Sequence, residues 1–442
     1  MHLAALLPLL TALSASNGPA NEGAGDWPQF LGPDRDSVAP WPNETFTWPE
    51  DGPSVAWRVE VGPGFGGVAV ADGEVFLLDR MRDEGDVLRV FDLGSGEELW
   101  AAGYPFEGRL NYDGSRTVPS IVGRRVYTAS GFGPVSCFDR DTQDMVWQVD
   151  LEKELGGDSP MFGWSTHPIV VDDLVLAAPL GPDTGLVALD RGTGEVRWKT
   201  AKVGFSHSTP IVATIRGEKQ ILFNACPDSG SAKKKPVPAY LWSINPTDGS
   251  VRWRHDVDLA SIPIPPPVVI DDERILLTGG YRAGSTLLNL DFDDSGEATF
   301  SEAWRITRGA QIHPPIVYRD HAYVIVNENW TNSRRNRDEG GLMCIGLDGK
   351  ERWRTGDDPN FGRGGIVRVA DALLLQDGFM GTLVAVRATS DAYEELGRFD
   401  AFDISGRDGQ LWAPLAVSGT RVVLRSQEEL VCVELAPTDQ QR

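Results

Sequence analysis

The stretch that decides the fold is Ala-Leu-Asp-Arg-Gly-Thr-Gly-Glu-Val-Arg-Trp, at residues 188–198. Alternating apolar residues lead to an Asp, a turn containing Gly follows, and a short charged run ends in Trp198. The phrase recurs, complete or weakened, with its Trp at Trp57, Trp100, Trp147, Trp253, Trp304 and Trp353. A degraded copy ends near Leu396. The period is about 48 residues, which indicates a repeat architecture.

A second phrase interleaves with the first. A Pro or Gly opens a β-branched strand, a polar pair turns the chain, and another apolar strand follows. The eight copies open at Gly67, Pro119, Pro168, Pro210, Pro267, Pro315, Gly365 and Pro414. Each unit therefore predicts four short strands joined by tight turns. Such a unit buries its faces only when neighbouring copies cover it.

The two ends of the chain predict that the repeats close into a ring. Residues 431–435 supply a third strand with no Trp strand after it, and residues 54–61 supply a Trp strand with nothing before it. Pairing the two completes an eighth unit and removes exposed sheet edges. The sequence therefore predicts an all-β, eight-bladed β-propeller of four-stranded antiparallel blades. Seven blades are the alternative.

The N-terminal region predicts export. Residues 3–13 form an apolar run that is shorter than the roughly 20 residues of a membrane-spanning helix, and small residues follow it. That pattern is typical of a signal peptide. We expect a soluble periplasmic or otherwise extracytoplasmic protein without a transmembrane segment, most simply a monomer. The predicted parts are a signal peptide at 1–16, an extension at 17–53, the propeller at 54–436 and a tail at 437–442.

Charge and cysteine content exclude several classes of partner and crosslink. The 64 acidic residues and 41 Lys or Arg residues give a net charge of −23. Nucleic acid is therefore not an expected partner, because no basic stripe is present to displace phosphate counterions. An anionic membrane surface is disfavoured for the same reason. Three of the four Cys occupy equivalent positions in separate repeats, too far apart for disulfides, so buried free thiols are expected.

The repeat resembles that of the PQQ-like propeller family, whose signature is roughly Asp-x-x-Thr-Gly-x-x-x-Trp. Asp190, Thr193, Gly194 and Trp198 match it. The resemblance implies a structural role for the repeated Trp residues, which dock between adjacent blades. The opening phrase Asp-Trp-Pro-Gln-Phe-Leu-Gly-Pro-Asp-Arg-Asp at residues 26–36 is similar to one found on exported bacterial propellers of this kind.

Two branches of the family imply different functions. Quinoprotein dehydrogenases bind pyrroloquinoline quinone and calcium beside a disulfide of adjacent Cys residues, and this sequence has no adjacent Cys pair. The other branch resembles BamB, the propeller subunit of the outer-membrane assembly machinery, which is a scaffold without chemistry. We therefore expect no cofactor. Pyrroloquinoline quinone with calcium belongs only to the alternative.

The loops that enter the inner strands are expected to gather around one mouth of the central channel. Arg and His there suit a carboxylate, a sugar or a partner loop. The alternative is that these side chains cap strands and bond loop carbonyls. The residues that the repeat alignment places at this mouth are Phe65, Arg116, His167, His207, His313, Arg363 and Trp412.

Loops between second and third strands are expected to open on the same face. Two of them are long and basic, which suits either a binding face or two solvated loops. The first, at 226–239, carries Lys233, Lys234 and Lys235; the second, at 327–340, carries Trp330, Arg334, Arg335 and Arg337; and a shorter loop adds Tyr281 and Arg282.

Catalytic and metal-binding patterns are weak. The sequence has no GxSxG, HExxH or P-loop motif, and the three mouth His lack the local spacing of zinc ligands. We therefore assign no catalytic residue and no metal. The function predicted from the sequence is an exported, non-catalytic scaffold that binds an envelope protein or polymer. The alternative is an enzyme on the same fold, either a divergent quinoprotein dehydrogenase or a polysaccharide lyase or hydrolase.

Overall fold

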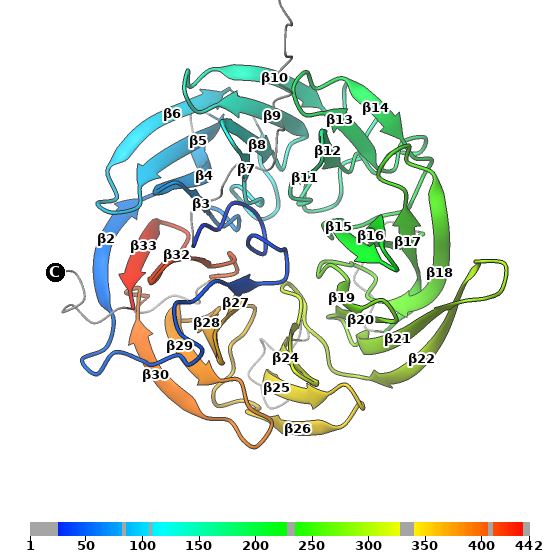
Figure 1. Ribbon diagram of the computed structural model, residues 1–442. Coiled ribbons are helices and arrows are strands. Elements are labelled where there is room, and N and C mark those ends of the chain that lie inside the picture. Colours follow the sequence, from blue (N-terminus) through cyan, green and yellow to red (C-terminus); the bar gives the residue numbers. More distant parts are fainter. Residues whose placement is uncertain are drawn as a thin grey trace, which may run out of the picture.

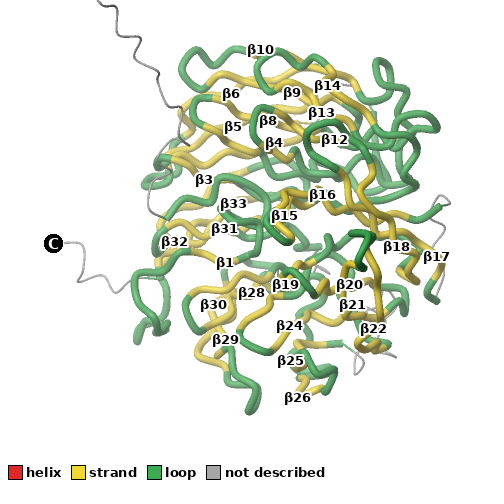
Figure 2. Tube along the Cα trace, turned by 45° about the vertical axis from the view of Figure 1, so that its right-hand side comes forward, coloured by secondary structure: helices red, strands yellow, loops and turns green. Residues whose placement is uncertain are grey.

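The computed structural model describes residues 25–81, 85–105, 108–227, 235–327, 340–404 and 410–435. Within these ranges the regular structure is β-strand alone (Figure 2). The strands form eight sheets that surround a central axis (Figure 1). The predicted all-β, eight-bladed propeller is therefore confirmed.

Blades 1 to 4 are four-stranded sheets in which consecutive strands pair antiparallel from the axis outward. Blade 1 contains β3 (Ala69–Ala71), β4 (Glu74–Met81), β5 (Gly85–Asp92) and β6 (Glu98–Tyr104); blade 2 contains β7 (Ser120–Val122), β8 (Arg125–Ala129), β9 (Pro134–Asp139) and β10 (Met145–Asp150). Blade 3 contains β11 (Ile169–Val171), β12 (Leu174–Ala177), β13 (Val187–Asp190) and β14 (Val196–Lys199); blade 4 contains β15 (Ile211–Ile215), β16 (Glu218–Ala225), β17 (Val237–Ile244) and β18 (Val251–Leu259).

Blades 5 to 8 repeat this order, with additions from the N-terminal residues. Blade 5 contains β19 (Val268–Asp271), β20 (Arg274–Gly279), β21 (Gly284–Phe292) and β22 (Ala298–Ile306); blade 6 contains β23 (Ile316–Tyr318), β24 (His321–Val326), β25 (Gly341–Gly346) and β26 (Glu351–Arg354). Blade 7 contains β27 (Ile366–Val369), β28 (Ala372–Gln376), β29 (Thr382–Arg387), β30 (Glu395–Asp400) and the added β1 (Val38–Ala39); blade 8 contains β31 (Ala416–Ser418), β32 (Arg421–Arg425), β33 (Glu429–Glu434) and β2 (Ser54–Glu60).

The decisive stretch forms the outer hairpin of blade 3. Its turn is held by Asp190, whose Oδ1 accepts hydrogen bonds from the backbone N–H groups of Gly192 and Thr193 at 2.9 and 3.0 Å. Trp198 then leans on the next blade and donates its indole N–H to the carbonyl of Pro246 at 2.9 Å. A Cβ at Gly249 would lie 2.5 Å from the Trp198 ring, so this close approach requires glycine. The repeated Trp thus joins neighbouring blades.

Blade 8 closes the ring, as the sequence predicts. β2, from the N-terminal part of the chain, pairs antiparallel with β33, so that Ser54 lies opposite Glu434 and Glu60 opposite Glu429. The two ends of the propeller are thereby held in one sheet. Because this sheet has no covalent connection between β33 and β2, ring closure depends on non-local contacts.

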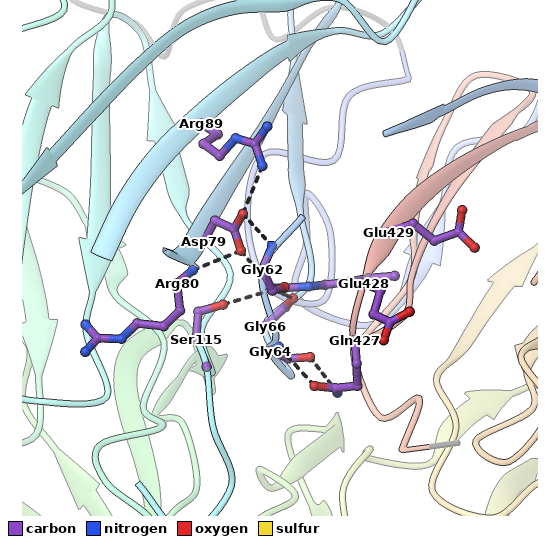
Figure 3. A network of polar contacts seen from close by, with 12 residues as sticks. Gly62, Gly64, Gly66, Asp79, Arg80, Arg89, Ser115, Gln427, Glu428 and Glu429 are labelled. Carbon is purple, nitrogen blue, oxygen red and sulfur yellow. Dashed lines mark hydrogen bonds and ion pairs between the residues drawn. The ribbon is translucent and has the colours of Figure 1, made fainter. Parts of the chain in front are cut away.

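A buried polar network reinforces this closure (Figure 3). Arg425 of β32 is 1% exposed, and its guanidinium donates to the carbonyls of Gly66 and Gly62 at 2.6 and 3.1 Å. It also reaches Ser115 Oγ at 2.9 Å and Asp79 Oδ1 at 3.3 Å. Asp79 belongs to blade 1, and Gly62 and Gly66 lie in the loop that connects blades 8 and 1. One side chain therefore links the last blade to the first two.

Residues 27–39 of the N-terminal extension lie against the inner strands of the ring. Trp27 forms a β-bridge with Val70 of β3, and Arg35 donates to the carbonyl of Val170 in β11 at 2.7 Å. β1 then pairs parallel with β27. In Figure 1 this dark blue segment passes through the middle of the ring between β3 and β27. Residues 27–39 therefore lie against the inner strands of blades 1, 3 and 7, whereas Phe46 and Trp48 pack farther out on blade 7.

Two further expectations concern cysteine and membrane spans. Cys137, Cys226, Cys344 and Cys432 are buried and not joined in disulfides, as predicted. A helix long and apolar enough to cross a membrane is not found among the described residues.

Candidate binding site

A cavity of about 480 Å³ lies at one mouth of the ring. Every blade contributes to it, because each delivers a residue from the loop that precedes its inner strand. Blade 5 delivers Ile264, which the sequence analysis did not single out. The other seven blades deliver the residues that the sequence predicted, namely Phe65, Arg116, His167, His207, His313, Arg363 and Trp412.

Two of the three histidines bond to backbone groups of other blades. His167 Nδ1 accepts the backbone N–H of Val118 at 2.8 Å, and His313 Nε2 donates to the carbonyl of Trp412 at 3.1 Å. Burial lowers the pKa of His313 to about 4. Burial, together with the nearby His313, lowers the pKa of His167 to about 3. Both rings are therefore neutral at pH 7 and contribute hydrogen bonds rather than positive charge.

His207 differs from the other two because one of its ring nitrogens is buried without a hydrogen-bond partner. The side chain is 5% exposed, and its Nδ1 lies 2.9 Å from Ser165 Oγ. Ser165 Oγ donates to the carbonyl of His207 at 3.2 Å, so the Oγ accepts from Nδ1–H. Nε2 is then a lone pair without a hydrogen-bond partner. Burial, and to a lesser extent Arg116, lowers the pKa of His207 to about 3, which keeps this nitrogen unprotonated.

The positive charge of the cavity comes from two arginines. Arg116 and Arg363 are each 8% exposed. Arg116 donates to the carbonyl of Gly114 at 2.5 Å and to that of Tyr112. Burial lowers its pKa to about 10, so it stays charged. Arg363 donates to Gln311 Oε1 at 3.1 Å, and its guanidinium lies 4.4 Å from the centre of the Trp412 ring. None of the described lining residues is acidic.

Aromatic rings form one side of the rim. Tyr112 is at their centre, with ring centroids 5.8 Å from Phe65, 5.6 Å from Phe162 and 5.4 Å from Trp412. All four side chains are partly exposed. Edge and tilted contacts of this kind hold rings in fixed positions while their faces stay available to a ligand.

Phe30 of the N-terminal extension closes the cavity on the inner side. Its ring stacks on His167 with centroids 3.7 Å apart and an interplanar angle of 16°. It belongs to the Trp-Pro-Gln-Phe phrase, whose role the sequence did not reveal. Tyr112, Phe162 and Gln311 were also missed, because they lie outside the three-residue windows that the repeat alignment defines. A search for aromatic residues in the longest inter-blade loops finds Tyr112 and Phe162.

The predicted basic loops are only partly described. Lys233, Lys234, Trp330, Arg334, Arg335 and Arg337 lie outside the described residues, whereas Lys235 and Arg282 are exposed. Tyr281 is 5% exposed and lines the cavity, where its hydroxyl accepts a hydrogen bond from Gln311 Nε2 at 3.2 Å. Tyr281 is therefore part of the mouth itself.

The donor set does not fit calcium-bound pyrroloquinoline quinone. Calcium takes six to eight oxygen ligands, with carboxylates prominent among them, and the described lining residues include neither Asp nor Glu. A cluster of three potential metal ligands is also not found in the described ranges. Cys137, Cys344 and Cys432 lie within strands of separate blades, Cys226 directly follows β16, and none of the four lines the cavity.

The fold and the site together define a β-propeller with a ligand-sized, aromatic and cationic cavity at one mouth. The family model described as outer membrane protein assembly factor BamB matches residues 83–282. The expected resemblance to PQQ-like propellers is therefore confirmed. No curated protein matches the sequence.

Solved structures share the fold at low sequence identity. BamB from Moraxella catarrhalis is 13% identical, with a TM-score of 0.57 over 86% of this chain and 97% of that one. A europium-containing methanol dehydrogenase is 11% identical, with a TM-score of 0.61 over 93% and 98%. Quinohemoprotein alcohol dehydrogenase from Comamonas testosteroni is 12% identical, with a TM-score of 0.59 over 93% and 80%. These similarities establish the fold and leave the function to the site.

Proposed function

We propose that this chain is an exported, non-catalytic propeller that binds a partner in the cell envelope through its mouth cavity. The observation that carries the proposal is the convergence of all eight blades on one cavity. Its volume is within the range of about 300–1,000 Å³ that is typical of ligand sites. The partner is a protein segment or an envelope polymer that inserts between the aromatic rings.

The chemistry of the lining favours binding over catalysis. An acid–base mechanism needs a group that exchanges a proton near pH 7. The pKa values of His167, His207 and His313 lie near 3 to 4, far below that range. Ser165 and His207 form a pair, but an acidic residue that would orient the imidazole is not among the described lining residues. The lining of the cavity therefore supports ligand binding without catalysis.

Export and envelope location complete the proposal. The apolar run at 3–13 has the length and the following small residues of a signal peptide. The matching family model describes an outer membrane assembly factor, which supports a scaffold in the same compartment.

Quantitative co-purification from envelope extracts tests the proposal. Wild-type protein is compared with Tyr112→Ala, which removes the ring at the centre of the rim. Leu99→Ala is the matched control, because Leu99 is 46% exposed on the outer strand β6, away from the mouth. We expect a partner that is captured by wild type and Leu99→Ala and lost with Tyr112→Ala. Equal capture by all three folded proteins would contradict a mouth-binding function.

The enzyme alternative has support from the similarity to two dehydrogenases and from the Ser165–His207 pair. A divergent dehydrogenase would show saturable binding of pyrroloquinoline quinone with calcium, followed by alcohol-dependent dye reduction. A polysaccharide lyase or hydrolase would release oligosaccharides in a glycan screen. Either result would replace the scaffold proposal.

A further inference from the structure

Arg116 indicates the charge of the group that the cavity binds. This buried cation bonds only to the carbonyls of Tyr112 and Gly114, and it forms no ion pair in the described part of the chain. The nearby Asp113 and Asp86 stabilise its charge at longer range, and Asp86 already pairs with another arginine. Buried charges in proteins are normally paired, because an isolated one is costly. Arg116 therefore favours an anionic ligand.

His207 indicates a second, different contact. Its Nε2 is buried without a partner and carries a lone pair, so it needs a hydrogen-bond donor. His207 and Arg116 line the same cavity, and the positive charge of Arg116 contributes to the lowered pKa of His207. A ligand that satisfies both has an anionic oxygen group and an N–H or O–H donor close to it.

The N-terminal residues beside the cavity favour a chain end as its ligand. Phe30 lines the inner side of the cavity, and residues 27–39 contact the inner strands β3, β11 and β27. A cavity backed by these residues favours a ligand that enters from the rim and ends inside it. The partly exposed rings of Phe65, Tyr112 and Phe162 line the same cavity as Arg116 and provide contact area for the residues that precede a chain end.

From these observations we propose that the cavity binds the C-terminal residue of a partner polypeptide. The terminal carboxylate pairs with Arg116, the amide N–H of the same residue donates to Nε2 of His207, and an apolar side chain packs among the rim rings. A C-terminal residue carries its carboxylate and its N–H on one Cα atom, which supplies both groups within a short distance. This inference rests on the proposed function and names the part of the partner that the mouth recognises.

Isothermal titration calorimetry with three probes tests the inference on the full chain. The probes are the tripeptide acetyl-Ala-Ala-Phe with a free carboxylate, its C-terminal amide, and 3-phenylpropanoate, which has the ring and carboxylate but no N–H. We expect the free acid to bind and both other probes to bind at least about tenfold more weakly, because charge-assisted hydrogen bonds are strong. Equal binding of acid and amide would overturn the inference, as would equal binding of 3-phenylpropanoate or no binding at millimolar concentration.

Variants at Arg116 separate recognition from folding. Arg116→Gln is expected to reduce the affinity for the acid to that for the amide, while Arg116→Lys, which keeps the charge, retains part of the difference. Arg124→Gln is the control, because the Arg124 side chain is 60% exposed on the surface. Thermal unfolding of each variant verifies that it is folded. An unchanged acid-to-amide ratio in folded Arg116→Gln would refute the role of Arg116.

The two proposals fail in different ways. If capture of the partner is lost with Tyr112→Ala but the free-acid and amide tripeptides bind equally well, the mouth-binding function stands and the proposed C-terminal recognition is wrong. If Tyr112→Ala captures the partner as well as wild type does, the proposed function fails together with the inference that rests on it.

Discussion

Replacing Arg425 by Met tests how the ring is held closed. The substitution keeps an unbranched apolar stem but removes the donors to Gly66, Gly62, Ser115 and Asp79. The Asp79 carboxylate loses one of its two arginine partners. It keeps the ion pair with Arg89 at 3.0 Å and the hydrogen bond from the backbone N–H of Gly62. Breaking a buried ion pair from one side costs about 3–5 kcal/mol. We expect a loss at the lower end of this range, about 3 kcal/mol in the free energy of unfolding, because Asp79 keeps Arg89 as a partner.

The assay is equilibrium unfolding in urea, followed by tryptophan fluorescence. Arg58→Met is the matched control in the same blade, because the Arg58 side chain is 41% exposed and its ion pair with Glu429 lies at the surface. Exposed pairs contribute about 0–1 kcal/mol. If Arg425→Met costs no more than Arg58→Met, the buried network does not hold the ring closed and the reasoning is refuted.

Three further predictions follow from burial. Trp198→Ala is expected to lower the free energy of unfolding by about 3–5 kcal/mol, since a buried, hydrogen-bonded ring is lost between blades; a change below about 1 kcal/mol in urea unfolding would contradict its structural role. His207 stays neutral in the folded protein down to a pKa of about 3 but takes up a proton near pH 6.5 when unfolded, so stability falls as the pH drops below 6.5. His207→Gln should therefore reduce the loss of stability between pH 7.5 and 5.5 by about 1.4 kcal/mol, and an unchanged loss would argue against a neutral, buried ring. Phe30→Ala should raise the pKa of His167 toward 6.5 by opening its environment to water; an unchanged NMR titration of that ring would show that Phe30 does not close the cavity.

The sequence predicted the fold and most of the mouth for one physical reason. A repeat that recurs at a fixed period places equivalent loops at equivalent positions around a ring. The residue preceding each inner strand could therefore be located without side-chain geometry, and His167, His207 and Arg363 were assigned to the mouth in this way. The closing pair β2 and β33 followed from the same argument, because each end of the chain lacked one part of the repeat.

What the sequence did not predict depends on features that do not repeat. Phe30 precedes the first unit, and Tyr112 lies in a long insertion, so periodicity placed neither. Arg425 and Asp79 are separated by 346 positions along the chain and meet only after the ring closes. The repeat pattern also did not predict protonation states. His167 is neutral because it is buried, and the sequence does not show that burial.

The most direct measurement of a mouth-bound partner is site-specific photo-crosslinking in the cell envelope. Benzoylphenylalanine is placed at Ile312, which is partly exposed and lines the cavity, and separately at Leu99 on the outer strand β6. We expect a discrete crosslinked partner from position 312, none from position 99, and loss of the product when Tyr112→Ala is added. A partner crosslinked from position 99 but not from 312 would contradict the central claim that this propeller binds through its mouth.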